Sequence, residues 1–167
     1  VDELGGLDKA IAKAAKLDGK KLCQILKNLE RCDFIMKFRY YGKKTQNRLY
    51  KLTDFYTLFY LKYIEPNIDS FDEQWWSKHY LSHSVEAWQG LTFELLCLFH
   101  ISQIRKALNI GGVASEAYIW FDKADKTKNQ RGAQIDLIIE RADRVINLCE
   151  MKFSQAQYKI SADYEIK

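Results

Sequence analysis

The sequence predicts a protein of mixed α and β structure that is divided into two domains. The chain has 167 residues, which is enough for two small domains with cores of their own. Apolar residues recur at helical spacing in some stretches and alternate or run together, as in strands, in others. A polar connector at residues 69–74 separates two such regions, so we expect domains at residues 1–65 and 70–167.

The overall composition excludes fibrous, disordered and membrane-spanning proteins. Hydrophobic residues make up 47% of the chain and charged residues 29%, and no apolar run approaches the roughly 18 residues of a membrane helix. The four cysteines form no CxxC pair, so we expect buried, reduced thiols in a cytoplasmic protein (Cys23, Cys32, Cys97 and Cys149). The first residue is Val1, and we expect the chain to be a piece of a longer protein.

Positive charge is concentrated at the start of the chain. Residues 1–52 carry 13 Lys and Arg against 6 Asp and Glu, whereas residues 53–167 carry 13 against 16. A basic region of this kind favours a polyanion or an acidic protein surface as its partner. The alternative is a solvated basic face without a ligand.

The order of elements in the first domain is that of a winged helix-turn-helix. We expect a helix at about 7–17 that is broken by Asp18-Gly19, a second helix at about 20–31, and a β-hairpin within 34–52. In such a domain the second helix enters the major groove of DNA and the hairpin is the wing. The expected nucleic-acid contacts are the basic residues of these two elements (Lys20, Lys21, Lys27, Lys43, Lys44 and Arg48). Winged helices also serve as protein-protein modules, so both functions remain open.

The second domain is predicted to contain a long helix followed by three strands. A segment rich in aromatic residues at 53–65 ends before Pro66, as a helix does. Apolar positions then predict one continuous helix at about 85–108 and strands at 116–121, 133–141 and 144–153. His79 and His83 are four residues apart and could form half a metal site, but no second pair accompanies them.

The last two predicted strands are apolar on both faces, which is typical of central strands. One face carries Ile135, Leu137 and Ile139, and the other carries Ile138, Ile146 and Leu148. We expect the second face to be poorly covered by the few residues that follow residue 154. An apolar patch of that kind predicts self-association into a homo-oligomer, or a natural chain that continues past Lys167.

Three charged residues interrupt these strands. A three-residue loop centred on Asp143 would place Asp136 directly opposite Glu150, and Lys152 would share a face with Glu150. Two carboxylates at that distance repel each other, and Mg²⁺ would resolve the conflict. Lys152 could then orient an attacking water. The alternative is a structural cluster in which the three side chains pair with one another.

These residues resemble the PD-(D/E)xK nuclease signature, with Asp136 followed by Glu150-Met151-Lys152 at the end of the next strand. The stretches 90–94 and 132–153 are similar to a narrower group, the C-terminal region of bacterial and archaeal AAA-type (DEXX-box) ATPases. That resemblance implies a winged helix followed by a restriction-endonuclease-like αβββ domain, here truncated at its C-terminal end. No proline precedes Asp136, and this is a departure from the motif.

The resemblance also implies roles for individual residues. It makes Asp136, Glu150 and Glu94 the metal-binding acids and adds Lys152 as the fourth catalytic residue, with Mg²⁺ as cofactor and DNA as substrate. It places an ATPase module in the same chain, although this sequence has no GxxxxGK[ST] phosphate loop. The expected function is a Mg²⁺-dependent, DNA-binding nuclease-like module. The alternative is a non-catalytic interaction module of the ATPase with a vestigial nuclease site.

Overall fold

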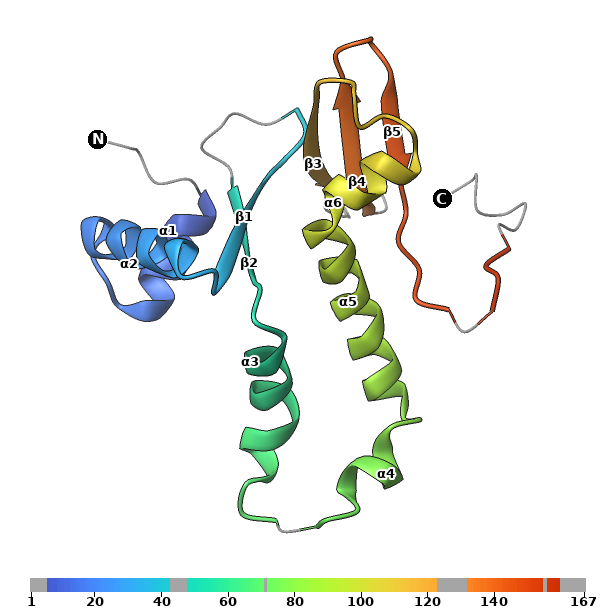
Figure 1. Cartoon of the computed structure of the whole chain (residues 1–167). Helices are drawn as coiled ribbons and strands as arrows, with labels where there is room; N and C mark the ends of the chain where they lie inside the picture. The colour runs from blue at the N-terminus through green and yellow to red at the C-terminus, as the bar shows by residue number, and fades with distance from the viewer. Residues whose placement is uncertain (1–5, 43–47, 71, 123–131, 155, 160–167) are drawn as a thin grey trace. The chain divides into compact units, whose positions relative to one another are not determined.

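The computed structural model of the chain describes residues 6–42, 48–70, 72–122, 132–154 and 156–159 (Figure 1). It shows a mixed α and β protein with a helical part and two small antiparallel sheets. The chain divides into two compact units, residues 1–85 and 86–167. The division lies 20 residues after the expected end of the first domain at residue 65, and the domain limits expected from sequence stay a prediction.

The first unit begins with two helices and a hairpin. Helix α1 spans Gly6–Ala15, α2 spans Gly19–Arg31, and the strands β1 (Ile35–Arg39) and β2 (Arg48–Leu52) pair antiparallel. Figure 1 shows α2 beside β1, and their core consists of Leu22, Leu26 and Phe38. The expected order of elements is confirmed, but the assignment to the winged-helix fold remains a proposal.

The boundary between α1 and α2 differs from the prediction. Helix α1 ends at Ala15 because Lys16 adopts a left-handed conformation, with a φ of 54°. Asp18 does not end α1; it caps α2, since its side chain accepts a hydrogen bond from the backbone N–H of Lys21 at 3.0 Å. Gly19 is therefore the first residue of α2 and not a C-terminal cap.

A helical segment of changing type follows the hairpin. It consists of α3 (Phe55–Phe59), a π-helical turn η1 (Tyr60–Ile64) and a 3₁₀ turn η2 (Glu65–Asn67). We expected the helix to end before Pro66, but η2 includes it. The reason is that Pro66 lies in the first turn of η2, where a backbone N–H has no helical partner to lose.

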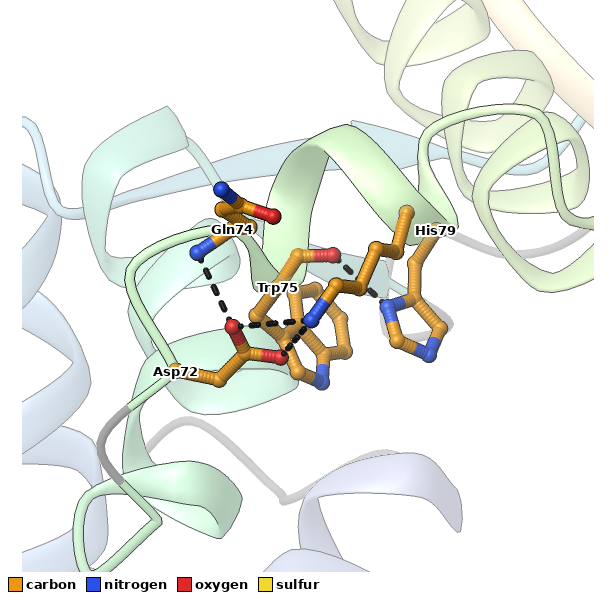
Figure 2. A network of polar contacts seen from close by, with 5 residues as sticks. Asp72, Gln74, Trp75 and His79 are labelled. Atoms are coloured by element: carbon orange, nitrogen blue, oxygen red, sulfur yellow. Dashed lines mark hydrogen bonds and ion pairs between the residues drawn. The ribbon is translucent and has the colours of Figure 1, made fainter.

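A short helix completes the first unit. Helix α4 spans Trp75–His79, and Figure 2 shows the polar contacts around it. The Asp72 carboxylate accepts hydrogen bonds from the backbone N–H of Gln74 and from Lys78, and the Lys78 ammonium, with Gln74, lowers the pKa of Asp72. His79 donates from Nδ1 to the Trp75 carbonyl oxygen at 2.6 Å. Since His79 ends α4 and His83 begins the next helix, the two histidines do not share one helix face.

The predicted continuous helix at 85–108 is interrupted. Helix α5 spans His83–Phe99 and α6 spans Ile101–Ala107. His100 separates them because its backbone is not helical (φ −105°, ψ 27°), and its ring bonds to the Leu96 carbonyl oxygen. The break allows α6 to take its own direction toward the sheet of the second unit.

The second unit contains a three-stranded antiparallel sheet. Its strands are β3 (Ser115–Asp122), β4 (Ala133–Arg141) and β5 (Ile146–Cys149), and β4 lies between the other two (Figure 1). The central position of β4 confirms the interpretation of its apolar faces, because Leu137, Ile138 and Ile139 are all buried. The core is completed from α5, β3 and the segments beside the sheet (Leu95, Leu98, Ile110, Ile119 and Met151).

The second apolar face of the sheet, with Ile138, Ile146 and Leu148, is only partly covered. Ile138 is only 2% exposed, so the prediction that it lacks cover is wrong. Ile146 and Leu148 are 46% and 65% exposed, as expected. In the described part of the sheet β5 is an edge strand, whereas the sequence was interpreted as placing it centrally.

All four cysteines are free thiols, as expected, but Cys32 is exposed and the other three are half-buried. Their exposure differs from the prediction because Cys32 is the C-cap that follows α2 and Cys149 ends the edge strand β5. Among the described residues, no helix combines the length and apolar character needed to cross a membrane.

Candidate functional site

The β4–β5 hairpin confirms the predicted register. Leu137 pairs with Cys149, and the pairs continue to Glu140 with Ile146. The connecting loop has three residues, Ala142–Arg144, and ends with Arg144 in the left-handed conformation that such loops require. The ladder ends at the Leu137–Cys149 pair, so the expected opposition of Asp136 and Glu150, the next residue on each side, stays a prediction.

Asp136 lies at an irregular position in the sheet. Between the Tyr118–Ile138 pair and the Trp120–Ile135 pair, β3 contributes one residue and β4 contributes two, of which Asp136 is the first. Such a bulge bends the strand and redirects a side chain. Asp136 is only 8% exposed. A buried acid at a strand bulge is a feature that the sequence pattern did not reveal.

Two hydrogen bonds fix the Asp136 carboxylate. Oδ2 accepts from the backbone N–H of Met151 at 2.9 Å, and Oδ1 accepts from the side-chain amide of Gln134 at 2.9 Å. The first bond explains why β5 ends at Cys149 and not at residue 153 as predicted. The side chain of Asp136 takes the Met151 N–H that a longer strand would use for pairing.

Met151 also orients its two charged neighbours. Its own side chain is buried, while Glu150 and Lys152 on either side of it are exposed and form an ion pair with each other. Since alternate residues of an extended segment point to opposite sides, both charged side chains lie on the same side. The structure thus brings Glu150 and Lys152 together, next to the segment that holds Asp136.

Helix α5 adds a second carboxylate to the surroundings of Asp136. Burial raises the pKa of the Cys97 thiol, and the negative charges of Asp136 and Glu94 raise it further. Both carboxylates are therefore close enough to Cys97 to act on it electrostatically. The rings of Phe93 and Phe153 lie 5.7 Å apart, so α5 also contacts the segment after Lys152.

The donor set fits a hard divalent cation. A carboxylate has about four lone-pair positions, and the hydrogen bonds from Gln134 and Met151 use two of those of Asp136. Mg²⁺ is commonly bound by one or two carboxylates together with waters and phosphate oxygens. Asp136 and Glu150 would hold such an ion, although within the described ranges no three His, Cys, Asp or Glu side chains are grouped to hold a metal by themselves.

The predicted nucleic-acid contacts lie mainly on α2. Lys20, Lys21 and Lys27 are exposed on that helix. Arg48 is half-buried at the start of β2, where it pairs with Arg39 of β1. The predicted contacts Lys43 and Lys44 lie outside the described residues.

Several residues of the site were missed by sequence reasoning. Gln134 and the Met151 backbone hold Asp136, and Cys97 lies within reach of its charge. A detectable signal existed for Gln134, because it precedes Asp136 by two residues and alternate residues of a strand share a face. The role of the Met151 N–H could not be predicted from residue type, because it is a backbone group.

Comparison of the chain with protein-family models, with curated proteins and with solved structures finds no match.

Proposed function

We propose that the second unit, residues 86–167, is a Mg²⁺-dependent nuclease-like module that acts on DNA. The observation that carries the proposal is the 2.9 Å hydrogen bond from the Met151 N–H to Asp136 Oδ2. It fixes a buried carboxylate beside Glu150 and Lys152. Acid, acid and lysine in this arrangement are the residues that the PD-(D/E)xK resemblance implies.

Each residue has a role in this proposal. Asp136 and Glu150 would hold the ion, and the bulge in β4 together with two hydrogen bonds keeps Asp136 in one orientation. The bound ion would supply charge stabilisation at the phosphate and a more acidic water. Lys152, held by Glu150, would orient the water and steady negative charge. Glu94 contributes negative charge from α5.

In this proposal the first unit, residues 1–85, would bind the DNA. Exposed lysines on α2 can contact phosphates, which is the part of binding that does not depend on base sequence. In the AAA-type ATPases that the chain resembles, both units would be attached to an ATPase module of the same polypeptide.

One observation favours a second function. The Glu150 carboxylate is already paired with Lys152, and a pair of this kind is also what a structural cluster would form. The competing proposal is a non-catalytic interaction module of the ATPase in which the acids hold the end of the sheet together.

Metal titration distinguishes the two functions. We expect calorimetry to detect binding of Mg²⁺ or Mn²⁺ to the chain, and metal-dependent cleavage of plasmid DNA. Asp136→Asn and Glu150→Gln should each weaken metal binding by about 100-fold, since even residues behind a metal ligand contribute about 10–100-fold. Lys152→Ala should keep metal binding and lose cleavage, because the lysine is not a ligand.

The matched control is Glu140→Gln, which removes a carboxylate that lies on the same strand as Asp136 but is exposed. It should leave metal binding and cleavage unchanged. If the chain binds no divalent metal, or binds it equally well after Asp136→Asn, the nuclease proposal fails and the interaction module stands.

A further inference from the structure

At the end of the three-stranded sheet that lies away from Asp136, four side-chain polar atoms are buried without a hydrogen-bond partner among the described residues. They are Arg105 Nε, Ser115 Oγ, Arg141 Nε and Asn147 Oδ1. Buried polar groups of folded proteins nearly always have a partner in protein, water or ligand. Four such atoms from four different elements indicate a site that something else completes.

The strand register places these residues together. Ser115 of β3 lies directly opposite Arg141 of β4, and Asn147 of β5 pairs with Ile139, two residues along the same face of β4. Opposed side chains start about 4.5–5.5 Å apart and diagonal ones about 7–8 Å, within reach of an arginine. Arg105 of α6 joins them, because its Nη2 donates to the Ser115 carbonyl oxygen at 3.0 Å.

The charge of the cluster is positive. Arginine does not lose its proton in proteins, so Arg105 and Arg141 contribute two permanent charges. The carboxylate of Asp143 accepts from Arg141 Nη2 and balances one of them. The exposed neighbours in sequence, Lys106 and Arg144 on the one hand and Glu116 and Glu140 on the other, offset one another.

We propose that this cluster binds a phosphate-like oxyanion. The two Nε–H groups and the Ser115 hydroxyl are donors, and guanidinium groups match phosphate oxygens in charge and geometry. Asn147 can present its amide nitrogen after a half turn of its amide group. The Arg141 side chain as a whole is 17% exposed but its Nε is buried, so an ion reaches the donors only when side chains of the cluster move apart.

This site is separate from the Asp136 site. Arg141 lies five positions after Asp136 on β4, which is about 16 Å along a strand. The oxyanion would be a free phosphate group of a small metabolite or a backbone phosphate of a nucleic acid. Neither source depends on the proposed metal site, so the two proposals can fail independently.

Inorganic phosphate is the probe for the test. The Tm of the chain should rise by about 3–6 °C at a phosphate concentration ten times Kd, relative to sodium chloride at equal ionic strength. Arg105→Gln and Ser115→Ala should each remove most of this rise. Lys106→Gln, which removes an adjacent exposed charge, should retain it.

A Tm that rises equally in all variants, or that does not rise in the unaltered chain, would overturn the proposal. Because Arg105→Gln can also disturb folding, direct calorimetric titration of the unaltered chain with phosphate decides the question independently. A second arm uses a 20-base-pair DNA duplex. Weaker duplex binding after Ser115→Ala identifies the source as a nucleic-acid phosphate, and unchanged duplex binding identifies a free phosphate group.

Discussion

The carboxylate of Asp136 is at once a structural group and a charge that acts on its neighbours. Both of its oxygens accept hydrogen bonds, and hydrogen bonds to charged groups contribute about 1.5–3 kcal/mol each to stability. Its negative charge also raises the pKa of Cys97, a residue on another element. The thiol therefore reports on the charge of the site without any assay of activity.

Asp136→Asn should make Cys97 easier to alkylate. The substitution removes a negative charge, so the pKa of Cys97 should fall, and more thiolate should be present at pH 8.5. Mass spectrometry of iodoacetamide-labelled peptides measures the rate at Cys97, and we expect a severalfold increase. Burial alone raises the pKa of Cys149, so its labelling rate should not change and serves as the internal reference. An unchanged rate at Cys97 would show that the Asp136 charge does not act there.

At the residue scale, the sequence predicted the register of β4 and β5 but not the contacts of Asp136. The register from Leu137–Cys149 to Glu140–Ile146 follows from a three-residue loop, because antiparallel pairing fixes successive pairs of a regular ladder once the loop is known. The bulge and the Met151 N–H were not predictable, since they depend on backbone geometry and not on residue type. The same applies to Ile138, whose burial depends on packing between segments distant in sequence.

At the scale of elements, most helices and strands were predicted and their ends were not. Three helices end at a left-handed residue that is not glycine, namely Lys16, Asp33 and Asn109. At each of these helix ends, backbone N–H groups beyond the helix donate to the last carbonyl oxygens. At the end of α1, for example, the Leu17 N–H donates to the Ala12 carbonyl oxygen at 3.0 Å. Sequence reasoning looked for glycine at such ends and assigned Gly19 to the wrong helix.

Helix α2 provides the test of DNA binding. Reversing two of its exposed charges, Lys20→Glu with Lys27→Glu, should weaken binding to any duplex DNA and reduce the slope of log K against log salt by about 1.8. The reason is that each phosphate contact releases about 0.9 counterion. Fluorescence anisotropy between 50 and 200 mM salt measures both quantities.

The matched control for α2 reverses exposed charges on other elements, Lys62→Glu on η1 with Lys106→Glu on α6. This variant should bind DNA nearly as well as the unaltered chain. Equal loss in both double variants would mean that net charge, and not α2, determines binding. Absence of binding at 50 mM salt would favour the protein-contact function of the first unit.

At the scale of the whole molecule, the charge is divided between the two compact units. Residues 1–85 carry 15 Lys and Arg against 11 Asp and Glu, whereas residues 86–167 carry 11 of each. The entire net charge of +4 therefore belongs to the first unit. This distribution supports a division in which the first unit attracts a polyanion and the second unit, neutral overall, holds the acidic site.

The exposed edge of the second unit provides the last prediction. Strand β5 exposes two apolar side chains, Ile146 (46%) and Leu148 (65%), and Val145 just before the strand is 43% exposed. An apolar edge strand can pair with a second copy of itself. Light scattering should show a mean mass that rises with protein concentration. Leu148→Lys should suppress the rise, because a charge on an edge strand opposes pairing between copies. Leu91→Lys is the matched control, since Leu91 on α5 is 64% exposed but belongs to no strand, and it should leave the rise unchanged. A chain that stays monomeric at high concentration would show that this edge does not pair between copies.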